Sequence, residues 1–138
     1  MTRLNGITLS VLRIVCGFLF VCAGGMKLLG WFGGMPAGIP MTPLILWAGI
    51  IELVGGALLM AGLATRPVAF LCSGEMAVAY FIGHAPGGFW PILNHGEPAV
   101  LLCFIYLHLA AAGGGPISVD HLIQNVRWLP ARRRAAAV

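Results

Sequence analysis

Charge is scarce in this sequence, and acidic residues are the scarcest. Lys and Arg together occur eight times and Asp and Glu four times, so only 9% of the 138 residues are charged while 59% are hydrophobic. Soluble domains carry about 25% charged residues. The shortage of charge therefore excludes an ordinary soluble domain and predicts an integral membrane protein, with residues 1–138 forming a single domain.

Other patterns are missing as well. The cysteines form no CxxC pair and no metal-ligand spacing, and all of them lie inside apolar runs (Cys16, Cys22, Cys72 and Cys103). We therefore expect no metal site and no reactive dithiol. The interleaved basic and aromatic residues of a nucleic-acid-binding surface are absent, so no nucleic-acid partner is expected.

What the sequence does contain is four long apolar runs, at residues 9–29, 44–63, 67–83 and 98–112. A transmembrane helix needs about 20 apolar residues to cross the hydrocarbon core. A further segment, at about 118–129, repeats apolar residues at spacings of three and four, which is typical of an amphipathic helix on a membrane surface. The expected fold is all-α: an antiparallel bundle of four transmembrane helices followed by a C-terminal cytoplasmic amphipathic helix.

The basic residues predict how this bundle is oriented. With four spans, Arg3, Arg66, Arg127 and the arginine run at 132–134 all lie on one side of the membrane, and the two opposite loops contain no Lys or Arg. The positive-inside rule assigns the basic side to the cytoplasm. We therefore expect a multi-pass protein whose two termini are both cytoplasmic and whose helices contact the lipid bilayer.

Two glutamates inside the spans need an explanation. Glu52 and Glu75 lie near the expected bilayer midplane, and neither has an opposite charge within one helical turn. A lone carboxylate in hydrocarbon costs several kcal/mol unless it is paired, protonated or facing a polar cavity. Lys27 can reach Glu52 and Arg13 can reach Glu75 if the first three spans pack together. On the simplest interpretation, these two ion pairs only fix the register of the helices.

Small residues support such packing. Gly17 and Gly24 share the face of the first span that carries both cations, and Gly56 lies on the Glu52 face of the second span. Glycine at this spacing lets two helix backbones approach closely. The charged faces of the first two spans are therefore predicted to meet.

A second interpretation gives the glutamates a chemical role. Lys27, Glu52, Glu75 and His84 would line a polar cavity in the outer half of the bundle, where the carboxylates exchange protons with a quinol or bind a small polar ligand. The catalytic candidates are then Glu52 and Glu75. The ligand-binding candidates are the same two acids together with Arg13, Lys27 and His84.

These motifs resemble the DoxX family of small four-helix bacterial membrane proteins. The resemblance covers nearly the whole chain and rests on the R…G…F…G…K pattern at 13–27, E-x-x-G-G…L-x-x-G-L-x-T-R at 52–66, M-A-V-A-Y-F at 76–81, G-F-x-P…N-x-G-E at 88–97 and G-P-x-S-x-D at 115–120. His95 stands where a second glycine is common in the family. The resemblance implies a bacterial plasma (inner) membrane location.

The resemblance also implies an association with redox chemistry. The family takes its name from protein subunits that are associated with the quinone-linked oxidation of sulfur compounds. We therefore expect a membrane subunit of a redox system that interacts with a quinone and with a partner protein, carries no covalently bound cofactor, and can form a homo-oligomer. A non-enzymatic scaffold or chaperone that anchors a partner protein, and a small proton-coupled permease, are the two alternatives.

Overall fold

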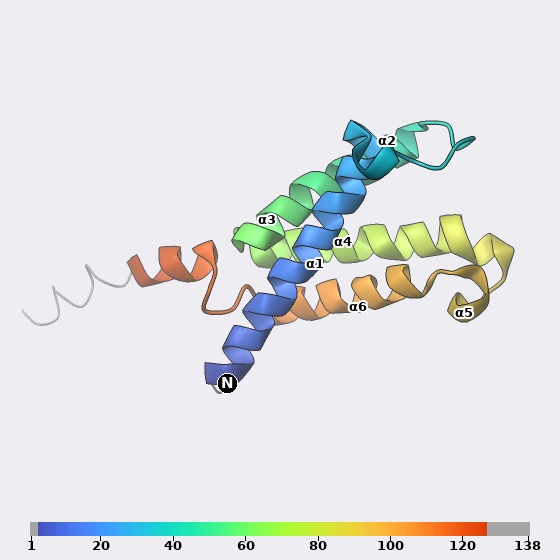
Figure 1. Cartoon of the computed structure of the whole chain (residues 1–138). Coiled ribbons are helices and arrows are strands. Elements are labelled where there is room, and N and C mark those ends of the chain that lie inside the picture. The colour runs from blue at the N-terminus through green and yellow to red at the C-terminus, as the bar shows by residue number, and fades with distance from the viewer. Residues whose placement is uncertain (1–2, 127–138) are drawn as a thin grey trace, which may run out of the picture.

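The computed structural model describes residues 3–126, which form helices and no β-strand (Figure 1). In chain order the elements are α1 (Arg3–Leu29), η1 (Trp31–Gly33), α2 (Pro43–Ile50), η2 (Ile51–Gly55), α3 (Gly56–Ala61), α4 (Thr65–Ala79), η3 (Tyr80–His84), η4 (Ala85–Gly87), α5 (Pro91–Asn94) and α6 (Glu97–Ala112). All four apolar runs predicted from the sequence are helical. The first helix starts at Arg3 rather than at residue 9, and Gly6 of its added turns lies against Pro116.

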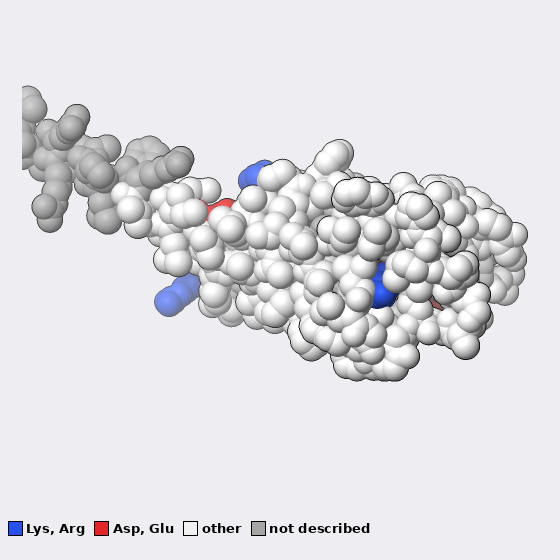
Figure 2. Space-filling view, turned by 90° about the horizontal axis from the view of Figure 1, so that it is seen from above, with Lys and Arg blue, Asp and Glu red and all other residues white. Residues whose placement is uncertain are grey.

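Within the described part of the chain, three helical stretches are long and apolar enough to cross a membrane, namely Arg3–Leu29, Pro43–Ala61 and Thr65–Gly87. α6 is also apolar but has only 16 residues. The second stretch consists of α2, η2 and α3, which continue one another. Figure 2 shows how little charge reaches the face in view, since nearly all of the atoms of the described residues that are visible there belong to neutral residues.

The helices form two groups (Figure 1). α1 packs along α2, η2 and α3, and α4 packs along α6. The groups meet through Phe20 and Tyr106, whose ring centroids are 4.7 Å apart, and the Tyr106 hydroxyl donates a hydrogen bond to the Cys16 carbonyl (2.9 Å). They diverge toward the end that carries segments 30–42 and 85–96, here called the long-loop end. The opposite end, with the 62–64 turn and segment 113–118, is called the short-turn end.

Two glycines bring the backbones of α1 and α3 into direct contact. A Cβ atom on Gly56 would lie 2.7 Å from the Gly17 carbonyl oxygen, and one on Gly17 would lie 2.8 Å from the Gly56 carbonyl oxygen. Neither position therefore has room for a side chain unless a backbone moves. The predicted meeting of the small-residue faces of the first two spans is confirmed.

The chain is helical again from residue 119 to 126. Ser118 caps this helix, because its hydroxyl accepts a hydrogen bond from the His121 N–H (3.2 Å). Leu122 and Val126 on its apolar side are exposed. The last turn of the helix predicted at 118–129, and the arginine run at 132–134, lie outside the described residues.

Candidate functional site

The second predicted span is not one regular α-helix, because a π-helical segment interrupts it at Glu52. Glu52 belongs to η2, a π-helical segment between α2 and α3. A π-helical turn contains one residue more than the α-helical hydrogen-bonding pattern allows, and such turns often occur at functional sites. The insertion changes the direction in which side chains on its two sides point. The carboxylate of Glu52 is thus presented by a widened turn, near the middle of an otherwise apolar stretch.

Glu52 and Lys27 form the ion pair predicted from the sequence. The Lys27 Nζ lies 2.7 Å from Oε1 and 2.6 Å from Oε2 of Glu52. The Glu52 side chain is only 4% exposed, whereas that of Lys27 is 21% exposed. An ammonium group has three N–H donors, so the contacts with the carboxylate leave Lys27 one donor. Since the carboxylate is buried, the pair compensates a charge that would otherwise be costly.

Glu75 has no such partner. Its Oε2 is buried and makes no hydrogen bond to any residue in the described range 3–126. Buried carboxyl oxygens without a partner are uncommon, because each loses its hydration without compensation. Glu75 is therefore the least satisfied polar group near the Lys27–Glu52 pair. A ligand with a hydrogen-bond donor would satisfy it.

Both glutamates line one large cavity between the two helix groups. Its volume is about 1150 Å³, and it also takes in Lys27 and His84. Nearly all the remaining lining is apolar, from α1, α2, α4 and α6 and from segment 35–42. Trp47 and Phe70 of the lining are more than 60% exposed, so the cavity opens on the side of the molecule that faces lipid. Four of the five site residues predicted from the sequence are thus brought together.

His84 is held by the long-loop end. It ends η3, the second π-helical segment, and its Nδ1 lies 3.0 Å from the Asn94 carbonyl oxygen. The Asn94 side chain in turn donates to the Gly88 carbonyl (2.6 Å) and accepts from the Gly96 N–H (2.8 Å). Tyr80 stacks on the His84 ring and donates to the Phe89 carbonyl. These contacts fix the imidazole at the edge of the cavity.

Arg13, the fifth predicted residue, lies elsewhere. The predicted Arg13–Glu75 pair is wrong, because the guanidinium is fully buried at the short-turn end and donates to backbone carbonyls. The acceptors are the carbonyls of Leu59, Met60 (2.8 Å), Gly114 (2.9 Å) and Ile117 (2.5 Å). The five-donor fork of arginine suits it to join several segments at once. Arg13 therefore ties α1 to the end of α3 and to segment 114–117.

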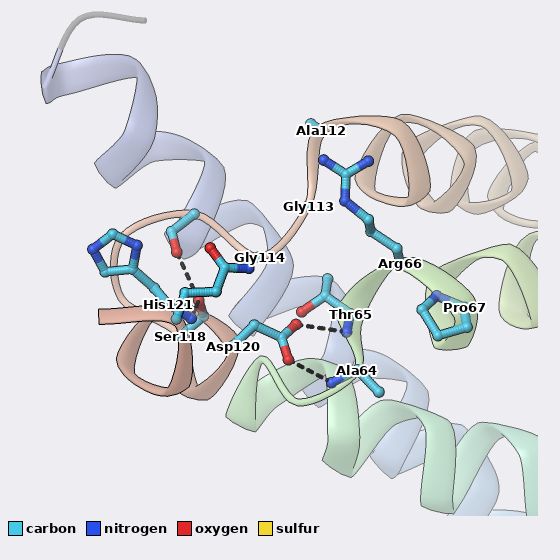
Figure 3. Close-up of a pocket in the computed structure, with 12 residues that line it drawn as sticks. Ala64, Thr65, Arg66, Pro67, Ala112, Gly113, Gly114, Ser118, Asp120 and His121 are labelled. Atoms are coloured by element: carbon cyan, nitrogen blue, oxygen red, sulfur yellow. Dashed lines mark hydrogen bonds between the residues drawn. The ribbon is translucent and has the colours of Figure 1, made fainter. Parts of the chain in front are cut away.

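Asp120 makes a further connection at the short-turn end, to Ala64 and Thr65, as Figure 3 shows. Its carboxylate accepts hydrogen bonds from the N–H groups of Ala64 and Thr65, both at 2.8 Å, at the start of α4. Partial burial acts to raise the pKa of Asp120, but the hydrogen bonds from Thr65 and Ala64 and the charge of Arg13 outweigh it, so the pKa lies below its ordinary value. An anionic side chain here also suits the helix dipole.

Only indirect signals for these structural groups are present in the sequence. Arg66 donates to the carbonyl of Ala111 (2.8 Å) at the end of α6, although its charge is interpreted from the sequence as an orientation signal. Asp120 and Asn94 belong to the family-like motifs at 115–120 and 88–97, but neither is a candidate site residue on sequence grounds. Their partners lie up to 56 residues away in the chain, which local spacing does not reveal.

The family model of DoxX matches residues 8–85, which is more than half of the chain. The chain belongs to the DoxX family. It is 41% identical over 118 residues to an uncharacterised protein of Haemophilus influenzae, covering 82% of this chain and 88% of that protein. It is 29% identical over 142 residues to the inner membrane protein YqjF of Escherichia coli, covering 93% and 100% respectively. No solved structure matches it.

The matched region of this DoxX family protein contains every residue of the candidate site. Lys27, Glu52, Glu75 and His84 all fall within residues 8–85, as does Arg13. Asp120, which caps α4, lies outside that region. With its apolar helices, the family places this chain among integral membrane proteins.

Proposed function

We propose that this DoxX family protein is an inner-membrane subunit of a redox system and that it binds a quinone in the cavity between its two helix groups. The observation that carries the proposal is the cavity itself, which is large, apolar and open toward lipid, with a few polar groups gathered in it. Binding sites for small amphipathic molecules have this character. A quinone has a polar head and an apolar tail and reaches its site through the bilayer.

Each polar group in the cavity has its own role in binding the quinone. The remaining Lys27 donor and the carboxyl group of Glu75 bind the quinone head, while Glu52 holds Lys27 in place through their ion pair. Conversion of a quinone to a quinol takes up two electrons and two protons. The electrons come from a partner redox protein. The carboxyl group of Glu75 passes one proton to a ring oxygen, and the ammonium group of Lys27, held by Glu52, passes the other; both groups regain their protons from water.

The same proposal includes a topology. Four antiparallel crossings with both termini in the cytoplasm agree with the side on which Arg3 and Arg66 lie. α6 spans only ~24 Å at 1.5 Å per residue, so local thinning of the bilayer accompanies the fourth crossing. In this orientation the long-loop end and His84 face the periplasm. The printed name of the Escherichia coli relative, an inner membrane protein, supports this location.

Quinone binding to the purified protein in detergent tests the proposal. The wild type is compared with Glu52→Gln and Glu75→Gln, and circular dichroism checks that each variant is folded. Glu97→Gln is the matched control, because Glu97 is exposed and does not line the cavity. We expect binding to fall at least tenfold in both cavity variants and to be unchanged in the control. Absence of quinone binding to the wild type would refute the proposal.

A scaffold that anchors a partner protein is the second candidate, and exposed aromatic residues favour it. Phe89 and Trp90 on the long-loop end are 66% and 64% exposed. Capture of a partner that survives both glutamate substitutions and is lost in a Phe89→Ser/Trp90→Ser variant would support this function. The quinone proposal expects partner capture to survive that double substitution, with quinone binding intact.

A further inference from the structure

The position of His84 determines which hydrogen bonds it can make in the cavity. A carbonyl oxygen only accepts hydrogen bonds, so the 3.0 Å contact with the Asn94 carbonyl requires the proton on Nδ1 of His84. In the neutral imidazole, Nε2 then carries a lone pair and is an acceptor. Nε2 makes no hydrogen bond to any residue described between 3 and 126. His84 therefore offers an acceptor at the edge of the cavity.

The surroundings prevent the ring from turning over to offer a donor instead. The Asn94 carbonyl lies in a turn that the Asn94 side chain fixes at both ends, through Gly88 and Gly96. The ring is also stacked on Tyr80, with ring centroids 6.4 Å apart and planes inclined by 22°. A flipped ring would lose the bond to Asn94 and leave that carbonyl without it, at a cost comparable to one hydrogen bond.

We propose that this cavity selects the reduced form of its ligand, a quinol, through a hydrogen bond from a quinol hydroxyl to Nε2 of His84. This inference rests on the proposed function. A quinol hydroxyl donates to an imidazole lone pair, whereas a quinone carbonyl placed there would set two acceptors against each other. Glu75 acts in the same direction, because its unpartnered carboxylate oxygen also accepts from a hydroxyl. The cavity thus binds the quinol, which is the product of the proposed reduction, more tightly than it binds the quinone.

The dissociation constants of quinone and quinol are expected to differ substantially, because the two forms carry different hydrogen-bonding groups. A site that leaves a polar group unpaired rejects the wrong form strongly, whereas differences in apolar size are discriminated weakly. One hydrogen bond gained against one lost corresponds to a factor of at least about ten in the dissociation constant. The head groups of quinone and quinol are nearly the same size, so this preference reports hydrogen bonding rather than fit.

The test measures binding of a short-chain ubiquinone and of its reduced quinol to the detergent-purified protein, under anaerobic conditions. We use about pH 8, where imidazole groups are generally neutral. The key variant is His84→Asn, because its Nδ2 occupies the place of Nδ1 and still donates to the Asn94 carbonyl, while nothing replaces Nε2. His95→Asn is the matched control, since His95 is exposed and does not line the cavity.

We expect the wild type and His95→Asn to bind the quinol at least tenfold more tightly than the quinone. His84→Asn is expected to lose that preference, because the dissociation constant of the quinol rises at least tenfold. Equal affinities in the wild type, or a preference that persists in His84→Asn, would overturn the inference and leave the proposed quinone site standing. A wild type that binds neither form would refute the proposed function itself. If His84→Asn does not fold, the comparison of the two ligands on the wild type still tests the inference.

Discussion

Replacing Arg13 gives the sharpest test of the structure, because sequence and structure assign it different partners. The guanidinium is fully buried and donates four hydrogen bonds to backbone carbonyls at the short-turn end. An Arg13→Met variant keeps most of the apolar volume but leaves those carbonyls without their donor. An Arg13→Lys variant keeps the charge on one nitrogen, which cannot reach acceptors on both sides of the guanidinium fork.

The expected loss of stability is large. A hydrogen bond from a charged donor contributes about 1.5–3 kcal/mol, and the four are not additive because they share one group. Removal of one partner from a buried charged network typically costs about 3–5 kcal/mol. We therefore expect Arg13→Met to lower the free energy of unfolding by about 3–5 kcal/mol and Arg13→Lys to lower it by roughly half as much.

Unfolding in detergent, followed by tryptophan fluorescence, measures these differences. Arg3→Met is the matched control, because Arg3 lies on the same helix and is exposed; it should change the free energy of unfolding by less than about 0.5 kcal/mol. A double-mutant cycle between Arg13→Met and Glu75→Gln should be additive within about 0.5 kcal/mol. A coupling above about 1 kcal/mol would restore the Arg13–Glu75 pair and refute the structural assignment.

The remaining predictions concern the ion pair, the glycine contact and Asp120. Lys27→Met should lower the free energy of unfolding by about 3–5 kcal/mol, because it leaves the buried Glu52 carboxylate unpaired. Adding Glu52→Gln to this variant should recover part of that loss. No recovery in the same unfolding assay would contradict the pairing. Gly56→Ala should destabilise by about 1–3 kcal/mol through its clash with α1, whereas Gly74→Ala, whose Cβ meets nothing within 4 Å, should not. Because the pKa of Asp120 is depressed in the folded protein, its stabilisation is present above about pH 4 and is lost as the pH falls through the folded pKa. Melting temperatures recorded between about pH 6 and pH 3 should therefore fall further in the wild type than in Asp120→Asn, and equal slopes would rule out that contribution.

Much of the fold could be predicted from the sequence because a bilayer imposes simple rules on it. Runs of apolar residues located all four main helices, and the spacing of glycines identified the faces on which α1 and α3 meet. The first helix was predicted too short, because its opening turns are stabilised by packing of Gly6 against Pro116, more than 100 residues away. Propensity and hydropathy do not register a contact of that kind.

The candidate site was predicted in part. The Lys27–Glu52 pair was predicted from the depths of the two residues together with the packing of the first two spans, which brings them within reach of each other. The same method failed for Arg13, because long side chains also reach backbone carbonyls, and segment 114–117 is not near Arg13 in sequence. The network around His84 depends on loop geometry between residues 84 and 96, which no periodic pattern describes.

The sequence by itself therefore determined that this is a helical membrane protein and on which faces its first two spans meet. The tertiary structure alone decided which groups share a cavity, that Glu75 Oε2 has no hydrogen-bond partner among residues 3–126, and that Nδ1 of His84 lies against the Asn94 carbonyl. The physical reason is that a rise of about 1.5 Å per residue fixes depth along a helix, whereas its rotation depends on its neighbours. The π-helical turns at Glu52 and His84 add a local rotation at those two residues.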